Sequence, residues 1–229
     1  MNVQASQEPL STTPVRMGVD RSVELMGDLT VPPGAGAVVL FAHGSGSSRH
    51  SSRNKLVAKE LNQSGLATLL FDLLTEEEEY QERHTRHLRF DIDMLADRLA
   101  TATDWIGQHA RVGALPVGYF GASTGGGAAL VAAAARPERV HAVVSRGGRP
   151  DLAGDALPNV RAPTLLIVGG ADEAVIELNE QALAQLRCEK RLEIVPRATH
   201  LFEEPGTLEQ VALLAREWFD RHFISRSPI

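Results

Sequence analysis

A serine lies between glycines in the stretch GYFGASTGGGAAL, residues 118–130. Ser123 follows an apolar run typical of a β-strand and precedes a series of small residues typical of a helix. Residues 121–125, GASTG, therefore place the pattern G-x-S-x-G at a strand-to-helix turn, which holds a serine hydroxyl out toward a substrate. Side chains at Gly121 and Gly125 would collide with their surroundings at so sharp a turn. The pattern predicts that Ser123 is a nucleophile that attacks acyl carbonyl groups.

A serine is a weak nucleophile unless a base accepts its proton, and an acid orients that base. In the chain order serine, acid, histidine, Asp172 follows the apolar run APTLLIVGG and His200 follows the run KRLEIVPRAT. Because the carboxyl ends of parallel strands meet at one edge of a sheet, we expect Ser123, Asp172 and His200 to form a catalytic triad there. Glu173 is the alternative acid. Three other histidines are excluded as the base because they do not follow the last predicted strand: His43, His50 and His141.

The loop FAHGSGSSRHSSRN, residues 41–54, follows an early predicted strand and contains an HG pair. We call this segment the oxyanion loop. A loop of this kind offers a backbone N–H to the oxyanion that forms when a carbonyl is attacked. We expect the N–H groups of Thr124 and Ser45 to form this oxyanion hole, with Gly46 as the alternative to Ser45. His43 is expected to hold the loop by hydrogen bonding rather than to act chemically.

Three arginines, Arg49, Arg146 and Arg149, are expected at the same edge of the sheet, and Arg49 is expected to open the helix after the oxyanion loop. An arginine binds a carboxylate through two parallel hydrogen bonds. One interpretation is that one or more of these arginines binds an acidic group of the substrate. The alternative is that they pair with carboxylates of the protein and hold loops together: Asp151, Asp155 and the glutamates at 76–79.

Apolar runs alternate with helix-like stretches along the chain. The runs, which suit parallel strands buried on both faces, lie at residues 36–44, 66–74, 115–123, 139–148, 162–170 and 190–199. Apolar residues recur at helical spacing from Ile92 to Ile106 and again from Leu208 to His222, the latter behind a predicted capping box from Thr207 to Gln210. The alternation predicts an α/β fold with a mostly parallel, doubly wound sheet, helices on both faces and an opening hairpin.

No Pro/Gly-rich linker divides the 229 residues. We expect a single domain over residues 15–229 behind a flexible tail of residues 1–14. The stretch TEEEEYQERHTRHLRF, residues 75–90, is expected to be a solvated loop or a short helix, and its two histidines, His84 and His87, are not expected to bind a metal.

The composition excludes several classes of protein. The chain has 23 basic and 29 acidic residues and a net charge of −6, which argues against a nucleic-acid partner. No apolar segment approaches the roughly 18 residues that span a bilayer, and the first residues lack the features of a signal peptide. The single cysteine, Cys188, cannot form an internal disulfide. We therefore expect a cytoplasmic protein that acts on a small-molecule acyl substrate without a membrane, metal or organic cofactor.

The strand–GASTG–helix motif, the HG loop and the later aspartate and histidine resemble those of the α/β-hydrolase superfamily, over nearly the whole chain. Only the stretch RPDLAGDALPNV, residues 149–160, separates two predicted strands where many members of that superfamily insert a cap, so no sizeable cap is expected. The compact size is similar to that of the dienelactone-hydrolase-like branch. The resemblance implies hydrolysis of esters or related acyl compounds by Ser123, Asp172 and His200. Dienelactone hydrolases have a cysteine nucleophile where this chain has Ser123, which favours a generic serine esterase over a lactone hydrolase. The stretches HGSGSSRHSSRN and SRGGRPDLAG also resemble a group of small bacterial hydrolases, some of which are fused to phosphoribosyltransferases.

Three functions are compatible with these residues. The sequence favours a serine hydrolase acting on carboxylesters, thioesters or lactones. An acyltransferase would use the same acyl-enzyme with an alcohol or amine as the acceptor, and a non-catalytic binding protein on a hydrolase fold would use none of this chemistry. A phosphate-binding loop at residues 121–125 is disfavoured because the lysine of the motif G-x-x-x-x-G-K-[ST] is missing.

Overall fold

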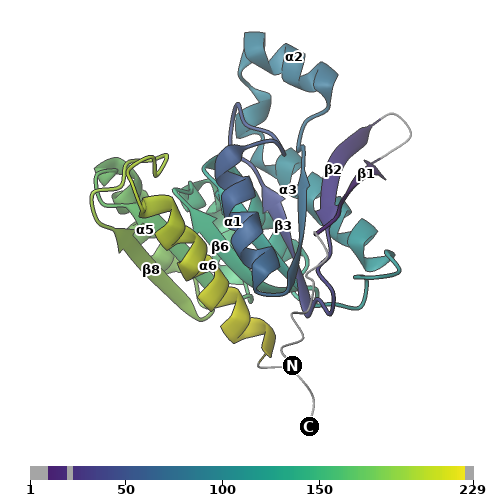
Figure 1. Ribbon diagram of the computed structural model, residues 1–229. Coiled ribbons are helices and arrows are strands. Elements are labelled where there is room, and N and C mark those ends of the chain that lie inside the picture. The colour runs from purple at the N-terminus through teal and green to yellow at the C-terminus, as the bar shows by residue number, and fades with distance from the viewer. Residues whose placement is uncertain (1–9, 20–22, 225–229) are drawn as a thin grey trace, which may run out of the picture.

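The computed structural model describes residues 10–19 and 23–224. Within these residues, one eight-stranded sheet has the order β1-β2-β4-β3-β5-β6-β7-β8 (Figure 1). Strands β3 to β8 run parallel to one another, whereas β1 and β2 are antiparallel to their neighbours, so the prediction of a mostly parallel sheet is confirmed. The strands are β1 (Thr12–Gly18), β2 (Glu24–Thr30), β3 (Ala37–Ala42), β4 (Leu66–Phe71), β5 (Val117–Ala122), β6 (Val140–Arg146), β7 (Thr164–Gly169) and β8 (Lys190–Val195).

The sheet begins inside the segment that the sequence assigns to a flexible tail. Strand β1 starts at Thr12 and pairs with β2 through Thr12 opposite Thr30 and Val15 opposite Gly27. Residues 12–14 therefore belong to the expected hairpin rather than to a tail, and residues 1–9 lie outside the described residues.

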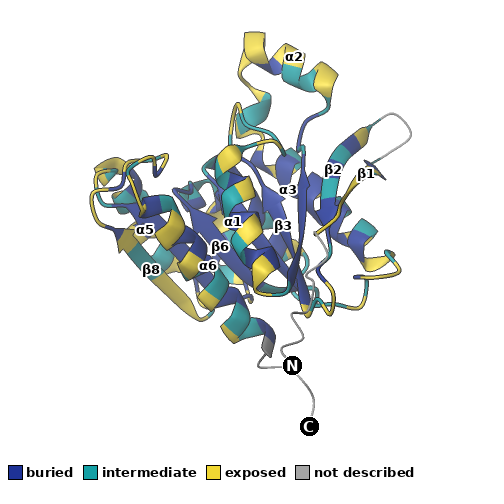
Figure 2. Ribbon diagram, in the orientation of Figure 1, coloured by how far each residue is buried: buried dark blue, intermediate teal, exposed yellow. Residues whose placement is uncertain are grey.

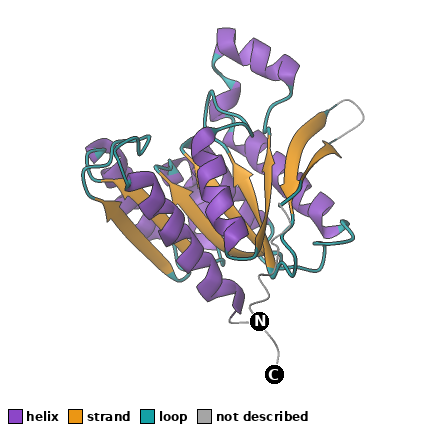
Figure 3. Cartoon of the chain, viewed as in Figure 1, coloured by secondary structure: helices purple, strands orange, loops and turns teal. Residues whose placement is uncertain are grey.

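Helices cover both faces of the sheet (Figure 3). Helices α1 and α6 pack on one face, where Trp218 and Phe219 of α6 join Val57 of α1 in one apolar cluster. Helices α3, α4 and α5 contribute to the apolar cluster on the other face. The helices are α1 (Ser52–Gln63), α2 (Glu76–Thr85), α3 (Ile92–Gly107), α4 (Thr124–Ala135), α5 (Glu173–Gln185) and α6 (Thr207–Ile224), with short 3-10 helices η1 (Leu88–Phe90) and η2 (Pro150–Asn159).

The apolar runs of the sequence form strands because neighbouring strands and helices cover them on both sides. Every residue of β3, β4, β5 and β7 is buried. Full burial of one large apolar side chain stabilises a fold by about 1.5–3 kcal/mol. Strand β8 differs, because it is the last strand of the sheet and most of its residues are exposed or half-buried (Figure 2).

Two predicted helix starts are wrong. Helix α1 begins at Ser52 with Ser51 as its cap, so Arg49 lies in the preceding loop and does not open the helix. Helix α6 begins at Thr207 itself, whose hydroxyl donates a hydrogen bond to the Glu204 carbonyl at 2.7 Å, so Thr207 does not cap it. The cap at Thr207 was predicted wrongly because a threonine hydroxyl can donate a hydrogen bond to a preceding carbonyl as well as accept one from the N–H groups that follow it.

The connection between β6 and β7 holds only the short helix η2, and no sizeable cap domain is inserted there. Helix α2 is the element that projects farthest from the sheet in Figure 1. It begins with a capping box between Thr75 and Glu78, whose side chains bond to each other's backbone N–H groups. Among the described residues, no helix combines the length and the apolar composition that crossing a bilayer requires.

Candidate active site

Ser123 occupies the turn between β5 and α4 in a backbone conformation that residues other than glycine seldom adopt. Its φ is 52° and its ψ is −124°. The N–H of Ser123 donates a hydrogen bond of 3.3 Å to the Arg146 carbonyl at the end of β6. The Ser123 carbonyl accepts hydrogen bonds from Gly126 (2.9 Å) and Arg149 (3.0 Å). These bonds hold a conformation that costs roughly 1–3 kcal/mol, as expected of a strained turn that presents a nucleophile.

The glycines on either side of Ser123 are required by close backbone contacts. A Cβ atom at Gly121 would overlap the backbone of Gly125 and Gly126 at the start of α4. A Cβ atom at Gly125 would overlap the carbonyl of Ala42 at the end of β3. The predicted collisions at Gly121 and Gly125 are confirmed. Because glycine has no Cβ atom, the first turn of α4 can pack directly against the carboxyl ends of β3 and β5.

An aspartate and a histidine from two other loops form a hydrogen bond at the same edge of the sheet. Nδ1 of His200, after β8, lies 2.7 Å from Oδ2 of Asp172, which stands between β7 and α5. A backbone hydrogen bond of 2.9 Å from Ala171 to the Ala198 carbonyl joins the two loops. Because Nδ1 faces the carboxylate, Nε2 is the ring nitrogen left to exchange a proton with a nucleophile or leaving group.

Ser123 and His200 line the same cavity, which has a volume of about 160 Å³. Asp172 stands behind the histidine, with 16% of its side chain exposed against 38% for His200. The alternative acid, Glu173, is exposed on the first turn of α5. The structure therefore brings Ser123, His200 and Asp172 together, in the arrangement expected from their order in the chain.

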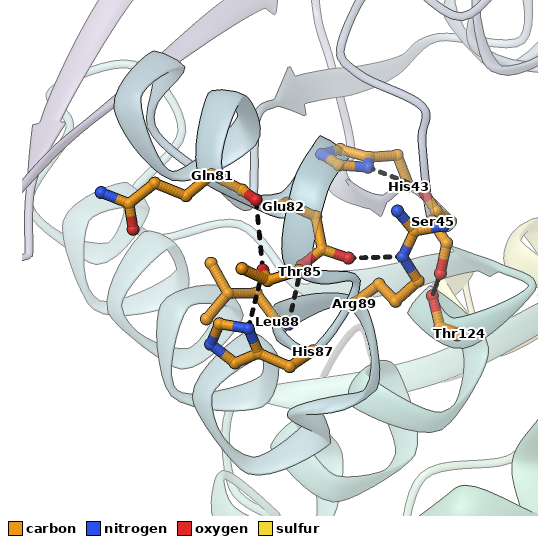
Figure 4. A network of polar contacts seen from close by, with 10 residues as sticks. His43, Ser45, Gln81, Glu82, Thr85, His87, Leu88, Arg89 and Thr124 are labelled. Carbon is orange, nitrogen blue, oxygen red and sulfur yellow. Dashed lines mark hydrogen bonds and ion pairs between the residues drawn. The ribbon is translucent and has the colours of Figure 1, made fainter.

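The two residues expected to supply the oxyanion hole lie side by side near this cavity. The hydroxyls of Ser45 and Thr124 are 3.1 Å apart, within hydrogen-bond distance (Figure 4). Thr124 is the first residue of α4, and the N–H groups of a first helical turn have no acceptor inside the helix. The Gly44 backbone lies so close that a Cβ atom there would be 2.8 Å from the Ser123 Cβ. The loop after β3 and the start of α4 thus approach Ser123 together.

His43 fixes the position of the oxyanion loop, as the sequence predicts. Its Nε2 accepts a hydrogen bond of 2.9 Å from the Leu73 N–H, after β4, and its Nδ1 lies 3.0 Å from the Gly44 carbonyl. This pattern requires a neutral ring that carries its proton on Nδ1. Burial lowers the pKa of His43 below its ordinary value of 6.5, which keeps the ring neutral.

Replacing His43 by alanine is expected to lower the free energy of unfolding by about 1–3 kcal/mol at neutral pH, because the buried Leu73 N–H loses its acceptor. A histidine whose pKa is lower in the folded state binds fewer protons when folded, so wild-type stability falls as the pH drops below 6.5. The difference between wild type and His43→Ala should therefore shrink in acid. Urea unfolding across this pH range measures it, with the exposed His50→Ala as the control. A difference that stays constant with pH would contradict this role.

Two of the three arginines considered for substrate binding already have carboxylate partners. Arg49 forms an ion pair with Asp72 and lies 3.8 Å from Asp28. Arg149 forms a bidentate pair with Asp151 at 2.7 and 2.8 Å, which is one of the pairings that the sequence offers as the alternative. These pairs fit the alternative that both arginines hold loops together, whereas no carboxylate of the described residues forms an ion pair with Arg146.

Arg146 and a residue that the sequence reasoning missed, Arg53, line the cavity of Ser123 and His200. Arg53 lies in the first turn of α1, which enters this cavity from the opposite face of the sheet to α4. No local pattern marks Arg53, because its place in the cavity depends on how α1 packs. The one feature of the sequence that could have indicated Arg53 is its position in the first turn of the helix that directly follows the oxyanion loop.

A larger cavity of about 680 Å³ lies between the oxyanion loop and α2. Glu82 is the one buried residue of α2, and it forms an ion pair with Arg89 and accepts a hydrogen bond from the Leu88 N–H (Figure 4). A second ion pair joins Glu78 of α2 to Arg98 of α3. The catalytic assignment rests on the smaller cavity, because the nucleophile and the histidine line that one.

The sequence matches the family described as alpha/beta hydrolase fold over residues 37–190. The structure is similar to that of a dienelactone hydrolase from Anabaena variabilis, with a TM-score of 0.91 and 63% identity over 93% of this chain and 98% of that one. Est1E from Butyrivibrio proteoclasticus has the same fold, with a TM-score of 0.76 and 18% identity over 93% of this chain and 99% of its own.

A protein of Mycobacterium tuberculosis (strain H37Rv) with the provisional name phosphoribosyl transferase is 56% identical over 224 residues. The match covers 98% of this chain and 49% of the mycobacterial protein. The chain thus spans about half the length of the curated relatives it matches.

Proposed function

The chain belongs to the α/β-hydrolase family, and we propose that it is a serine hydrolase that cleaves ester-type acyl bonds through an acyl-enzyme on Ser123. The substrate class comprises carboxylesters, thioesters and lactones. One observation carries the proposal: Ser123 stands in a strained turn at the end of β5 and shares a cavity with a histidine that is hydrogen-bonded to Asp172. The similarity to a dienelactone hydrolase at 63% identity supports the same reaction class.

The reaction follows from the roles of the residues. His200 accepts the Ser123 proton at Nε2 while the serine oxygen attacks the acyl carbonyl, and Asp172 stabilises the imidazolium that forms. The N–H groups of Thr124 and Ser45 bind the oxyanion, and loss of one such donor costs about 2.7–4 kcal/mol in activation free energy. His200 then protonates the leaving group. Water then attacks the acyl carbonyl as it gives a proton to His200, and His200 returns that proton to the Ser123 oxygen as the acid leaves.

A fluorophosphonate probe should label the native protein at Ser123, because such a probe reacts with an activated serine and not with an ordinary one. We expect a single labelled peptide containing Ser123 by mass spectrometry. Heat-unfolded protein is the control, since unfolding separates the serine from His200. A folded protein that resists labelling and hydrolyses none of a panel of acyl esters would instead be a binding protein on this fold.

The acyltransferase alternative uses the same acyl-enzyme, so labelling does not separate it from a hydrolase. Product analysis with an added alcohol or amine does. We expect the free acid to remain the main product, because nothing in the proposed mechanism excludes water from the acyl-enzyme. An acyl ester or amide of the acceptor as the main product would assign the protein as a transferase.

A further inference from the structure

Strand β8 has an open backbone edge at the end of the sheet. It is the last strand in the order of the described residues, and Figure 1 shows no described strand beyond it. On its inner side, the carbonyls of Glu189 and Val195 each accept a hydrogen bond of 2.8 Å, from the N–H groups of Thr164 and Gly170. Backbone groups alternate in direction along a strand, so three residues point their N–H and C=O groups outward: Lys190, Leu192 and Ile194.

The edge at the other end of the sheet is interrupted by a proline. Pro14 lies in the middle of β1, opposite Asp28 of β2. Proline has no N–H group, and in an edge strand it turns that position toward the open side. It breaks the row of donors that a further strand would need, which is one way in which proteins protect a sheet edge from pairing. Strand β8 contains no proline and is not protected in this way.

One face of the β8 edge is apolar. Leu192 packs against the apolar cluster to which α5 contributes, and because side chains alternate along a strand, Lys190 and Ile194 share this face. Ile194 is 45% exposed (Figure 2). The Lys190 ammonium is held by two carbonyls at the end of α5, at 2.6 and 2.8 Å, so its alkyl stem lies over this face.

The opposite face carries two charges that select one register for pairing with a second copy of the chain. Arg191 and Glu193 form an ion pair there. In an antiparallel pair about a twofold axis, outward-pointing residues must lie opposite outward-pointing residues. An axis at Leu192 meets this condition and places Arg191 of each copy opposite Glu193 of the other. The two neighbouring registers, with axes at Arg191 or Glu193, place like charges opposite each other, which destabilises a sheet.

We propose that two copies of this chain associate through antiparallel pairing of their β8 strands about a twofold axis at Leu192, so that the two sheets join into one. About six backbone hydrogen bonds would connect the strands. On the apolar face the two Leu192 side chains meet, and each Ile194 is covered by the Lys190 stem of the other copy. The strand is thus complementary to itself in backbone, apolar contacts and charge. This inference concerns association and does not depend on the proposed function.

Sedimentation velocity of the full chain tests the association. We expect a dimer of twice 24.7 kDa with a dissociation constant of about 1–100 µM, because one strand pair forms a small interface. Arg191→Glu should weaken it at least about 10-fold. The matched control is Arg16→Glu, which breaks the exposed ion pair with Glu24 at the β1 edge and should dimerise as wild type. Wild type that stays monomeric well above this range, or a dimer that Arg191→Glu leaves intact, would overturn the proposal.

Mixing two charge variants tests whether the contact lies between copies. Arg191→Glu and Glu193→Arg each place like charges opposite each other in a dimer, so each alone should be largely monomeric. In an equimolar mixture, each charge of one variant meets the opposite charge of the other, and heterodimers should form. The ion pair within one copy is broken in both variants, so the recovery can come only from contacts between copies. Circular dichroism checks that both variants are folded, and no recovery on mixing two folded variants would overturn the proposed pairing.

Disulfide formation tests the register. Leu192→Cys, in a Cys188→Ser background, should form a covalent dimer on mild oxidation. Residues on the axis have Cα atoms about 5.5 Å apart, within the range of roughly 4.4–6.8 Å that a disulfide spans. The matched control is Lys190→Cys in the same background, whose counterpart lies four residues away along the strand, roughly 14 Å, and should not crosslink. Crosslinking of Lys190→Cys but not of Leu192→Cys, or of neither, would overturn this register.

Discussion

Replacing Ser123 by alanine is expected to lower kcat/KM for acyl esters by about 10⁴- to 10⁶-fold, because the oxygen that forms the acyl-enzyme is removed. Some catalysis over water should remain, since the oxyanion donors and the binding cavity are unchanged. Alanine has the same unfavourable positive φ as serine at this turn, so the backbone strain stays and the free energy of unfolding should change little. Steady-state hydrolysis and urea unfolding measure the two quantities.

The matched control for this change is Ser47→Ala, which removes a hydroxyl from the oxyanion loop but leaves Ser123 in place. Turnover of Ser123→Ala at a rate near that of wild type would exclude an acyl-enzyme on this residue. Because the fluorophosphonate label requires the same oxygen, the variant should also be unlabelled.

The second large effect is expected for Asp172→Asn, with a loss of about 10⁴-fold in kcat. The 2.7 Å contact between Asp172 and His200 orients the ring, and an asparagine amide would favour the wrong tautomer and would not stabilise the imidazolium. Glu173→Gln is the matched control, because it neutralises the next residue along the chain, whose side chain is exposed on α5. Steady-state hydrolysis of one ester by both variants gives the comparison.

If Asp172→Asn kept most of its activity and Glu173→Gln lost it, the acid of the triad would be Glu173. If both variants lost activity while remaining folded, the reaction would require the negative charge of both carboxylates at the start of α5 rather than that of one acid.

Much of the fold could be predicted from the sequence because the sheet is parallel and buried. Strands such as β3 and β7 read as continuous apolar runs, and the helical repeat from Ile92 to Ile106 corresponds to α3, with those two residues buried. The approximate position of the site also followed from the sequence, because parallel strands bring their carboxyl ends to one edge. Ser123, Asp172 and His200 follow β5, β7 and β8, and their positions after predicted strands could be inferred without knowing any side-chain contact.

The ionic partners of the site could not be predicted, because they depend on packing between segments far apart in the chain. Arg49 pairs with Asp72 and Asp28, neither of which was among the partners that the sequence suggested. Arg53 reaches the cavity through the position of α1 on the sheet, which no local pattern encodes. Helix caps were ambiguous for another reason. Thr75 and Thr207 are each followed three residues later by a glutamate or glutamine, yet of these two threonines only Thr75 caps a helix.

Helix α2 bounds the larger cavity, and Glu82 is the only buried residue of this helix. Two ion pairs, Glu82 with Arg89 and Glu78 with Arg98, attach the helix to the rest of the chain. The position of α2, and with it the shape of that cavity, therefore depends on two largely buried ion pairs, whereas the position of Ser123 is set by the packed ends of the strands. Substitutions at the exposed α2 residues that line the cavity, Glu76, Tyr80 and Arg83, are expected to alter what fits beside the oxyanion loop without disturbing either apolar cluster. We therefore expect substrate specificity to change through α2 more readily than through the segments that position Ser123.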